Sequence, residues 1–208
     1  MKPFKSLFVL AIVCAPALAS AQGYYGPGGQ GSGNPGYGFH HRMGRLAFGF
    51  GLGLGFMSDN GSGITACDNC DFKPYAFEAD IHLGGMITPR FALMFEGQGN
   101  LQTIDRASGF DGGNTTLTQG AAMIAGQFWV IPQLWVKGGL GFSHLQVDND
   151  FFTDDLGGGL ALMAAAGFEV FSARNFAIDI QGRIIEGTYN SGDDHVTSGT
   201  IGVGFDWY

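Results

Sequence analysis

Polar or small residues alternate with large apolar ones in several stretches of this 208-residue sequence. Residues two apart on a β-strand point to the same face, so these stretches predict strands with one polar face. The ionisable residues on the polar side of this alternation are Glu78, Asp80, His82, Glu96, Lys137, Glu169, Asp179, Arg183 and Asp206. Gathered inside a fold, they would form either a rigid polar plug or a gated path for protons or ions. Carboxylates outnumber cations in the set, so we expect some of them to share protons or to contact water.

Other residues of types that act in catalysis or bind metals in known proteins do not form a complete catalytic or metal site in this sequence. Ser143 and His144 are adjacent, so on a strand they point to opposite faces and do not make a nucleophile and base pair. Acidic residues gather in two polar stretches: Asp148, Asp150, Asp154, Asp155, Asp193 and Asp194. Their spacing is not that of an EF-hand, and solvated loop charge explains them better than a calcium site. We therefore expect no enzymatic activity, no metal and no cofactor.

The end of the chain shows what kind of strand carries the polar faces. Ile201, Val203, Phe205 and Trp207 form a large apolar face, whereas the residues between them are glycine, threonine or aspartate. The same alternation occurs eight times, at 46–56, 75–84, 91–100, 117–130, 134–143, 159–170, 176–184 and 200–207. The pattern in 117–130 fits either face assignment. Eight strands with one apolar face indicate an all-β chain.

The connections between the predicted strands alternate between short and long. Short connections lie at 88–90, 131–133 and 172–175, and long polar ones at 57–74, 102–116, 146–155 and 186–195. Bacterial outer-membrane barrels have short periplasmic turns, long external loops and both termini in the periplasm. The face of Gly, Ala and a few charges is too sparse in solubilising groups for an exterior but suits a narrow lumen. The sequence therefore predicts an eight-stranded antiparallel transmembrane β-barrel whose large apolar side chains meet lipid.

Aromatic residues fall at the ends of the predicted strands, where interfacial girdles of a membrane barrel lie. They are Tyr75, Phe91, Phe128, Trp129, Phe176, Trp207 and Tyr208.

The first 43 residues differ from the rest of the chain. Lys2 and Lys5 precede an apolar run that ends before Ala19-Ser20-Ala21, so residues 1–21 predict a cleaved signal peptide. Residues 22–43 are rich in glycine and proline and predict a flexible periplasmic tether, which leaves 44–208 for the barrel. No later segment is a run of about 18 or more large apolar residues, so no transmembrane helix is expected. The formal net charge of −8, without a basic cluster, argues against nucleic-acid partners.

Two cysteines lie close together in the first long connection, as Cys67-Asp68-Asn69-Cys70. An exported chain reaches an oxidising compartment, and the pair is even once Cys14 leaves with the signal peptide. A local disulfide is therefore the main interpretation. A zinc site would need two more ligands close in sequence, and a redox site would need a thioredoxin-like context.

Four stretches carry a resemblance to a known family: the Gly/aromatic strand at 46–56, TPRFAL at 88–93, LWVKGGLGF at 134–142 and GVGFDW at 202–207. From Gly44 to Tyr208 the chain resembles the small eight-stranded outer-membrane proteins that include the OmpA transmembrane domain, OmpX and OmpW. The last stretch is similar to the C-terminal signal read by the barrel-assembly machinery. The resemblance implies that Ile201, Val203, Phe205, Trp207 and Tyr208 form this signal. Family members usually stop at the final aromatic residue, so either Trp207 or Tyr208 is the effective signal residue.

The resemblance says more about the fold than about activity, because this fold hosts anchors, adhesins, pores and lipid-modifying enzymes. The leading hypothesis is a non-enzymatic protein of a Gram-negative outer membrane that supports envelope integrity and presents four loops for surface interaction. The alternative is a narrow channel or carrier for small molecules, since inward glycines leave room for a small ligand. A lipid-modifying enzyme is disfavoured. The expected partners are outer-membrane lipid and lipopolysaccharide, the assembly machinery during biogenesis, and a surface ligand of the loops.

Overall fold

The computed structural model of the protein describes residues 45–59, 62–63, 75–104, 115–149, 153–173, 175–189 and 194–208. All of them belong to the second of two units into which the chain divides, Met1–Gly33 and Asn34–Tyr208. The signal peptide (1–21), the tether (22–43) and the Cys67–Cys70 disulfide lie outside the described residues and stay predictions.

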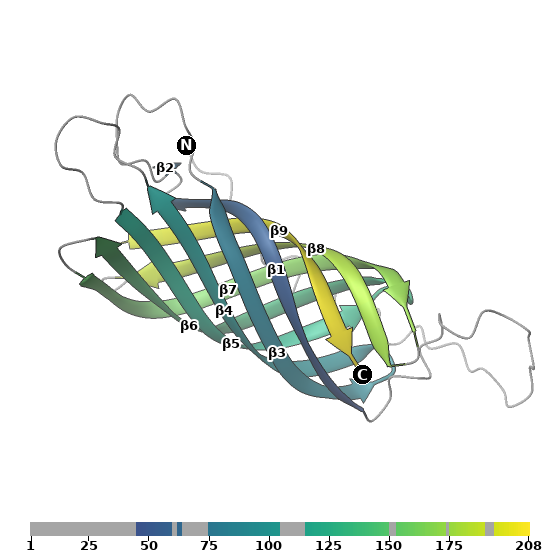
Figure 1. The fold of residues 1–208 in the computed structure, drawn as a ribbon. Coiled ribbons are helices and arrows are strands. Elements are labelled where there is room, and N and C mark those ends of the chain that lie inside the picture. The colour runs from purple at the N-terminus through teal and green to yellow at the C-terminus, as the bar shows by residue number, and fades with distance from the viewer. Residues whose placement is uncertain are drawn as a thin grey trace, which may run out of the picture. The chain divides into compact units, whose positions relative to one another are not determined.

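Eight long strands form a closed antiparallel barrel, as the sequence predicts (Figure 1). They are β1 (Leu46–Asp59), β3 (Ala76–Thr88), β4 (Phe91–Ile104), β5 (Thr115–Trp129), β6 (Leu134–Asn149), β7 (Thr153–Ser172), β8 (Phe176–Tyr189) and β9 (Asp194–Trp207). The two-residue strand β2 (Ser62–Gly63) pairs only with the end of β1. No helix in the described part of the chain is long and apolar enough to cross a membrane.

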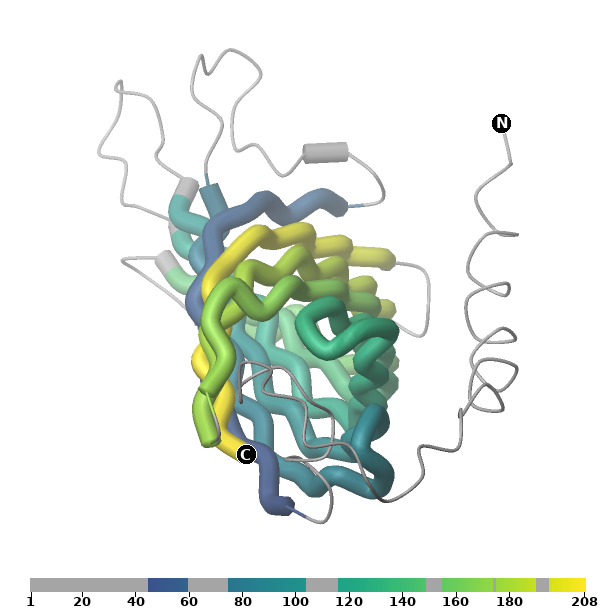
Figure 2. Tube along the Cα trace, turned by 90° about the vertical axis from the view of Figure 1, so that its right-hand side faces the viewer, coloured from purple at the N-terminus to yellow at the C-terminus, as the bar shows by residue number. Residues whose placement is uncertain are grey.

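The first and last long strands close the barrel. β1 and β9 pair without a shift from Phe48 opposite Trp207 to Asp59 opposite Val196. Figure 2 shows the start of β1 beside the end of β9. Closure leaves each long strand with a neighbour on both sides, and this removes the open edge that lipid does not tolerate.

The two ends of the barrel differ in their connections. One end, called here the turn end, holds the start of β1, the end of β9 and the short connections 89–90, 130–133 and 173–175. The opposite end is called the loop end. There the third and fourth connections are shorter than expected, because β6 and β7 leave only 150–152 between them and β8 and β9 only 190–193. The polar residues assigned to these loops continue the ladder beyond the apolar band, since pairing does not require an apolar face.

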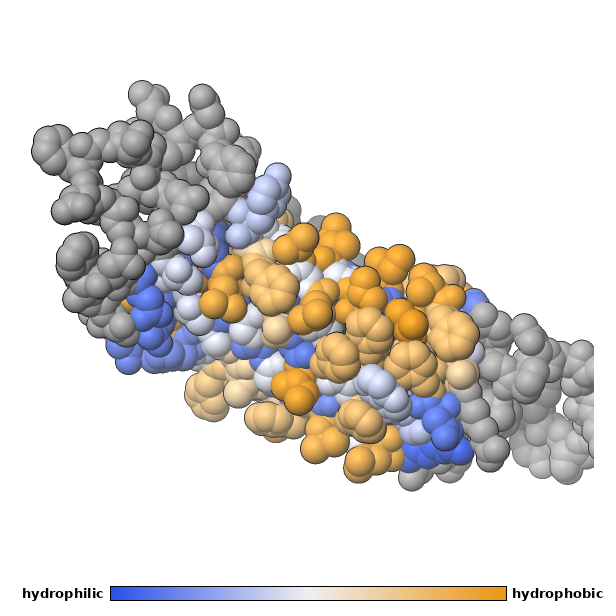
Figure 3. Space-filling view, in the orientation of Figure 1, coloured by the Kyte–Doolittle hydropathy of each residue, from blue (hydrophilic) through white to orange (hydrophobic). Residues whose placement is uncertain are grey.

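The outer wall is apolar over most of its height (Figure 3). Phe142 and Ile201, for example, are 73% and 71% exposed, which fits contact with lipid rather than water. Among the described strand residues, outward-facing ionisable side chains lie only toward the loop end: His144, Asp148, Asp155, Glu186 and His195. On β8, the nine residues from Phe176 through Ile184 match the 9–11 residues of a transmembrane β-strand. The barrel is therefore built to span a membrane, with its loop end projecting beyond the apolar band.

Candidate functional site in the barrel lumen

All nine polar residues singled out from the sequence lie inside the barrel, and each is at most 6% exposed. Four neighbouring strands, β8, β9, β1 and β3, enclose most of them. Burial this deep means that their charges must be paired, hydrogen-bonded or hydrated from within.

Arg183 on β8 is the centre of the network. Its Nη1 atom lies 2.8 Å from Glu78 Oε1, and its Nη2 atom lies 3.2 Å from Asp80 Oδ1 and 3.0 Å from Glu96 Oε1. The guanidinium also donates to Gln98 Oε1 at 3.2 Å and to Gln181 Oε1 at 3.3 Å. One planar cation thus ties together carboxylates from β3 and β4, which the forked geometry of arginine favours.

Glu96 is shared by both permanent cations of the lumen network. Lys137 Nζ lies 3.2 Å from Glu96 Oε2, while Arg183 holds the other oxygen of the same carboxylate. The ammonium of Lys137 also sits 5.2 Å from the ring centre of Trp135, within the range of a cation–π contact. The network therefore reaches across the lumen, from β8 through β4 to β6.

His82 links two carboxylates from different strands. Its Nε2 atom is 2.7 Å from Asp206 Oδ1 on β9, and its Nδ1 atom is 3.5 Å from Asp80 Oδ1 on its own strand. The carboxyl groups of Asp206 and Asp179, the latter on β8, lie close enough to interact electrostatically. Two carboxyl groups in one buried site favour a shared proton over two negative charges.

Glycines on β1 make room for these side chains. β1 lies between β3 and β9, so a contact such as that of His82 with Asp206 must pass over it. A methyl group on Gly49 would collide with the His82 ring, and one on Gly51 would collide with the Asp80 carboxylate. From sequence the inward glycines leave room for a small ligand, but here Gly49, Gly51 and Gly53 are covered by the polar side chains of His82, Asp80 and Glu78.

The turn end of the lumen is packed with aromatic side chains. Trp129 is fully buried, and its indole N–H donates to Glu169 Oε1 at 2.8 Å. Tyr208 packs edge-on against Trp129 with ring centres 5.9 Å apart, and its hydroxyl lies 3.5 Å from the same carboxylate oxygen. The prediction that Trp129 and Tyr208 belong to the interfacial girdle is wrong. Trp129 shares the inward face of β5 with Gln127, whereas Phe128 points outward.

Several contributors to the network were not singled out from the sequence as site residues. Gln98 and Gln181 hold the Arg183 guanidinium, and Thr200 donates its hydroxyl hydrogen to Glu78. Toward the loop end, Gln119 donates to the Tyr189 hydroxyl at 3.0 Å and Asn100 donates to Ser198 Oγ at 3.1 Å. The only sequence signal for these residues is that they share the inward alternation of the charged ones.

The other chemical candidates remain apart. Ser143 is buried in the lumen, whereas His144 lies on the outer wall and pairs with Asp155 at 3.5 Å, so they form no catalytic pair. Within the described ranges, no group of three or more His, Cys, Asp or Glu side chains is placed to hold a metal ion.

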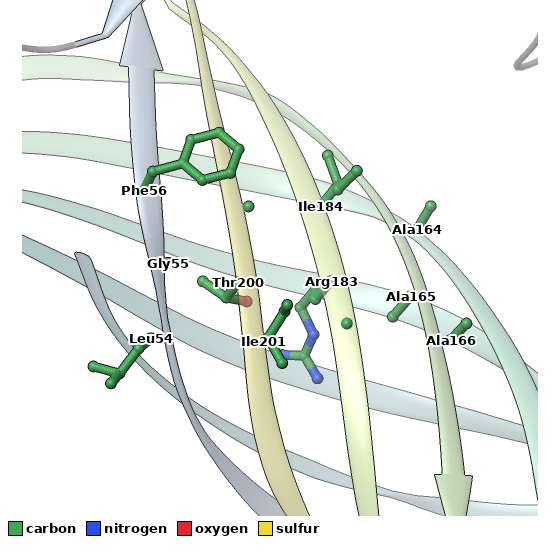
Figure 4. Close-up of a pocket in the computed structure, with 12 residues that line it drawn as sticks. Leu54, Gly55, Phe56, Ala164, Ala165, Ala166, Arg183, Ile184, Thr200 and Ile201 are labelled. Atoms are coloured by element: carbon green, nitrogen blue, oxygen red, sulfur yellow. The ribbon is translucent and has the colours of Figure 1, made fainter. Parts of the chain in front are cut away.

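A shallow groove of about 570 Å³ lies on the outer wall over β7, β8, β9 and β1 (Figure 4). Small residues such as Gly182 and Gly199 make its floor, and larger apolar side chains border it: Leu54, Phe56, Ile184 and Ile201. Arg183 also lines it, but its guanidinium binds Glu78 on the lumen side. The groove faces the lipid side of the wall and offers apolar contact without a catalytic group.

An aromatic ladder covers the closing seam on the same outer wall. The Trp207 ring stacks on Phe48 with centres 5.1 Å apart and contacts Phe176 at 4.9 Å, while Phe205 stacks on Phe50 at 5.0 Å. Trp207 therefore belongs to the outward face with Ile201, Val203 and Phe205, and Tyr208 does not. The assembly signal itself stays a prediction.

Comparison with known proteins relates this chain to solved barrels by shape rather than by sequence. No protein-family model and no curated protein matches it. One similar structure is that of Ail, the attachment invasion locus protein of Yersinia pestis, solved in complex with the heparin analogue sucrose octasulfate. It is 14% identical to this chain with a TM-score of 0.53, and the match covers 79% of this chain and 99% of the Ail chain. Neisserial surface protein A is 14% identical with a TM-score of 0.51 and covers 78% and 95%. The chain therefore has the fold of the small eight-stranded outer-membrane β-barrels, the group that its sequence resembles.

Proposed function

We propose that the protein is a non-enzymatic barrel of a Gram-negative outer membrane, closed to solutes, that strengthens the envelope and presents its loops for interaction. The observation that carries the proposal is the Arg183 network, in which one buried guanidinium joins three carboxylates across the lumen. Interlocked buried charges suit a rigid plug rather than an open pore. The apolar wall would meet lipid and lipopolysaccharide, and the loop end would face outward.

The loops would provide the surface interaction. The segments between the strands at the loop end carry, by sequence, Asp68, Asp71, Asp105, Asp111, Asp150 and Asp193 against Lys73 and Arg106. Ail was solved with sucrose octasulfate, which is a polyanion. Loops with this acidic excess would repel such a ligand, so we expect a surface partner that is neutral or cationic. During biogenesis the partner would be the barrel-assembly machinery, acting on the apolar face of β9.

Single-channel recording in a planar bilayer tests the plug. We expect the wild-type protein to be silent in potassium chloride and Arg183→Ala to show openings, because its removal frees three carboxylates from their shared cation. Arg45→Ala is the matched control, since Arg45 lies at the turn end and donates to Asn175 at 2.7 Å outside the network. Heat-dependent gel mobility would verify that each variant is folded. Frequent openings of the wild type would overturn the proposal.

A narrow channel or carrier is the second candidate, and Glu96 favours it. This carboxylate is held by both Lys137 and Arg183, so a small displacement toward either cation would rearrange the network without leaving it unpaired. Wild-type openings that disappear in Glu96→Gln would establish this candidate in place of the plug.

A further inference from the structure

Titratable side chains form a nearly continuous chain along the lumen. Glu78 and Asp80 meet at Arg183, Asp80 faces His82, and His82 bonds to Asp206. Asp206 is an electrostatic neighbour of Asp179, which in turn is an electrostatic neighbour of Glu169 at the turn end. Toward the loop end, the Thr200 hydroxyl binds Glu78. The plug thus also contains a succession of groups that accept and release protons.

Buried polar atoms beside this chain lack hydrogen-bond partners in the described part of the protein. Toward the loop end they are Asn100 Oδ1, Gln119 Oε1 and Ser143 Oγ, and toward the turn end Asp179 Oδ1, Gln127 Oε1 and Trp135 Nε1. Gln98 Nε2 and Arg183 Nε add two more at the middle. Buried polar atoms of this kind bind internal water, which completes hydrogen-bonded paths between side chains. The unpartnered atoms therefore occur toward both ends of the lumen and at its middle, and they include His82 Nδ1 and Asp80 Oδ1 of the chain itself.

We propose that the lumen passes protons between its two ends while it excludes hydrated ions, with His82 as the relay between Asp206 and Asp80. This goes beyond the proposed plug and is compatible with it, because a proton moves along hydrogen bonds and needs no open pore. The carboxylates number six, Glu78, Asp80, Glu96, Glu169, Asp179 and Asp206, against two permanent cations, Lys137 and Arg183. This excess gives the interior an affinity for protons.

In the relay step, His82 gains one proton at Nε2 and loses one at Nδ1. A proton delivered from Asp179 through the Asp206 carboxyl passes to Nε2 across the 2.7 Å contact and gives an imidazolium beside two carboxylates. The proton on Nδ1 then passes to Asp80 through one water molecule, because Nδ1 and Asp80 Oδ1 lie 3.5 Å apart and neither has a direct hydrogen-bond partner among the described residues. One proton has entered and one has left, and the ring is neutral in its other tautomer. Rotation of the ring, or proton exchange with water, restores the starting tautomer.

Proton flux into vesicles tests the proposal. The protein is refolded into phosphatidylcholine vesicles that contain a pH-sensitive dye, and valinomycin with potassium clamps the membrane potential during an acid jump. A parallel set without valinomycin contains a potassium-sensitive dye. We expect the wild type to pass protons above the level of protein-free vesicles and potassium at that level. His82→Gln should lower the proton flux at least about tenfold, because glutamine forms hydrogen bonds but does not take up a proton.

His144→Gln is the matched control. It is the same substitution on the outer wall, where His144 pairs with Asp155 outside the lumen, and it should leave the flux unchanged. Heat-dependent gel mobility reports whether each variant is folded, and His82→Asn offers a second non-titrating side chain if His82→Gln does not fold. Proton flux equal to that of protein-free vesicles, or equal in wild type and a folded His82 variant, would overturn the proton path. Potassium flux through the wild type would instead overturn the closed plug.

Discussion

Removal of Arg183 should destabilise the barrel far more than removal of an arginine at its rim. The Arg183 side chain is 1% exposed and contacts Glu78, Asp80 and Glu96 at 2.8, 3.2 and 3.0 Å. Breaking a buried ion pair by deleting one partner costs about 3–5 kcal/mol, because the remaining charge stays buried. Each carboxylate keeps another polar contact, with Thr200, His82 or Lys137. We therefore expect Arg183→Ala to lower the free energy of unfolding by about 3 kcal/mol, roughly two orders of magnitude in the folding equilibrium.

Urea titration of the protein in vesicles measures this loss, with heat-dependent gel mobility and tryptophan fluorescence as independent readouts. Arg45→Ala is the control, because an exposed polar contact contributes at most about 1 kcal/mol. The double variant Arg183→Ala with Glu78→Gln should lose less than the sum of the two single losses, since the second change removes a carboxylate that the first left unpaired. Additive losses, or an Arg183→Ala loss no larger than that of Arg45→Ala, would refute the reasoning.

Glycines and aromatic residues in the wall give three more expected outcomes. In urea titration, Gly51→Ala should lower the free energy of unfolding by about 1–3 kcal/mol, because its methyl group would meet a buried carboxylate. Gly120→Ala, which has nothing within 4 Å, should change it by less than about 0.5 kcal/mol, and equal losses in the two variants would contradict this prediction. Trp129→Phe should cost about 1.5–3 kcal/mol through loss of a 2.8 Å hydrogen bond to a carboxylate, and a loss below about 0.5 kcal/mol would disprove that role. Trp207→Ala should slow refolding into vesicles more than Tyr208→Ala, because only Trp207 stacks across the seam; equal rates would argue against this.

The alternation of large apolar with polar or small residues predicted the strands, because a shift of one residue in a membrane barrel exchanges the lipid-facing and lumen-facing side chains. A slip of one residue in β3 would turn Glu78, Asp80 and His82 toward lipid and Phe77 and Ile81 into the lumen. For every strand except β5, only one assignment is therefore compatible with a membrane, and together with the alternating short and long connections this predicts the eight-stranded antiparallel barrel.

The same rule, applied more strictly, would have placed Trp129. Phe128 and Trp129 are consecutive, so they cannot both face lipid on one strand. The alternation of β5 is ambiguous because its small residues fit either face, and Gln127, buried in the lumen, is the residue that decides the parity. Tyr208 follows the same rule, since it comes directly after the outward-facing Trp207, and the alternation of β9 therefore directs it inward, where it packs against Trp129.

The alternation did not reveal which charged side chains contact each other, because those contacts depend on the stagger between the strands of the closed barrel. Glu78 and Arg183 are 105 residues apart, on β3 and β8, and two other strands lie between them in the wall. Their contact passes over the inner faces of β1 and β9, and the glycines of β1 leave that path free of side chains. From sequence, Gly51 contributes room for a ligand. In the structure it leaves room for the Asp80 carboxylate, whose place any larger residue at this position would occupy. In a narrow barrel, a run of inward glycines therefore indicates where side chains from the neighbouring strands meet. The feature to look for in sequence is a long polar residue on one strand opposite a glycine on the neighbouring strand.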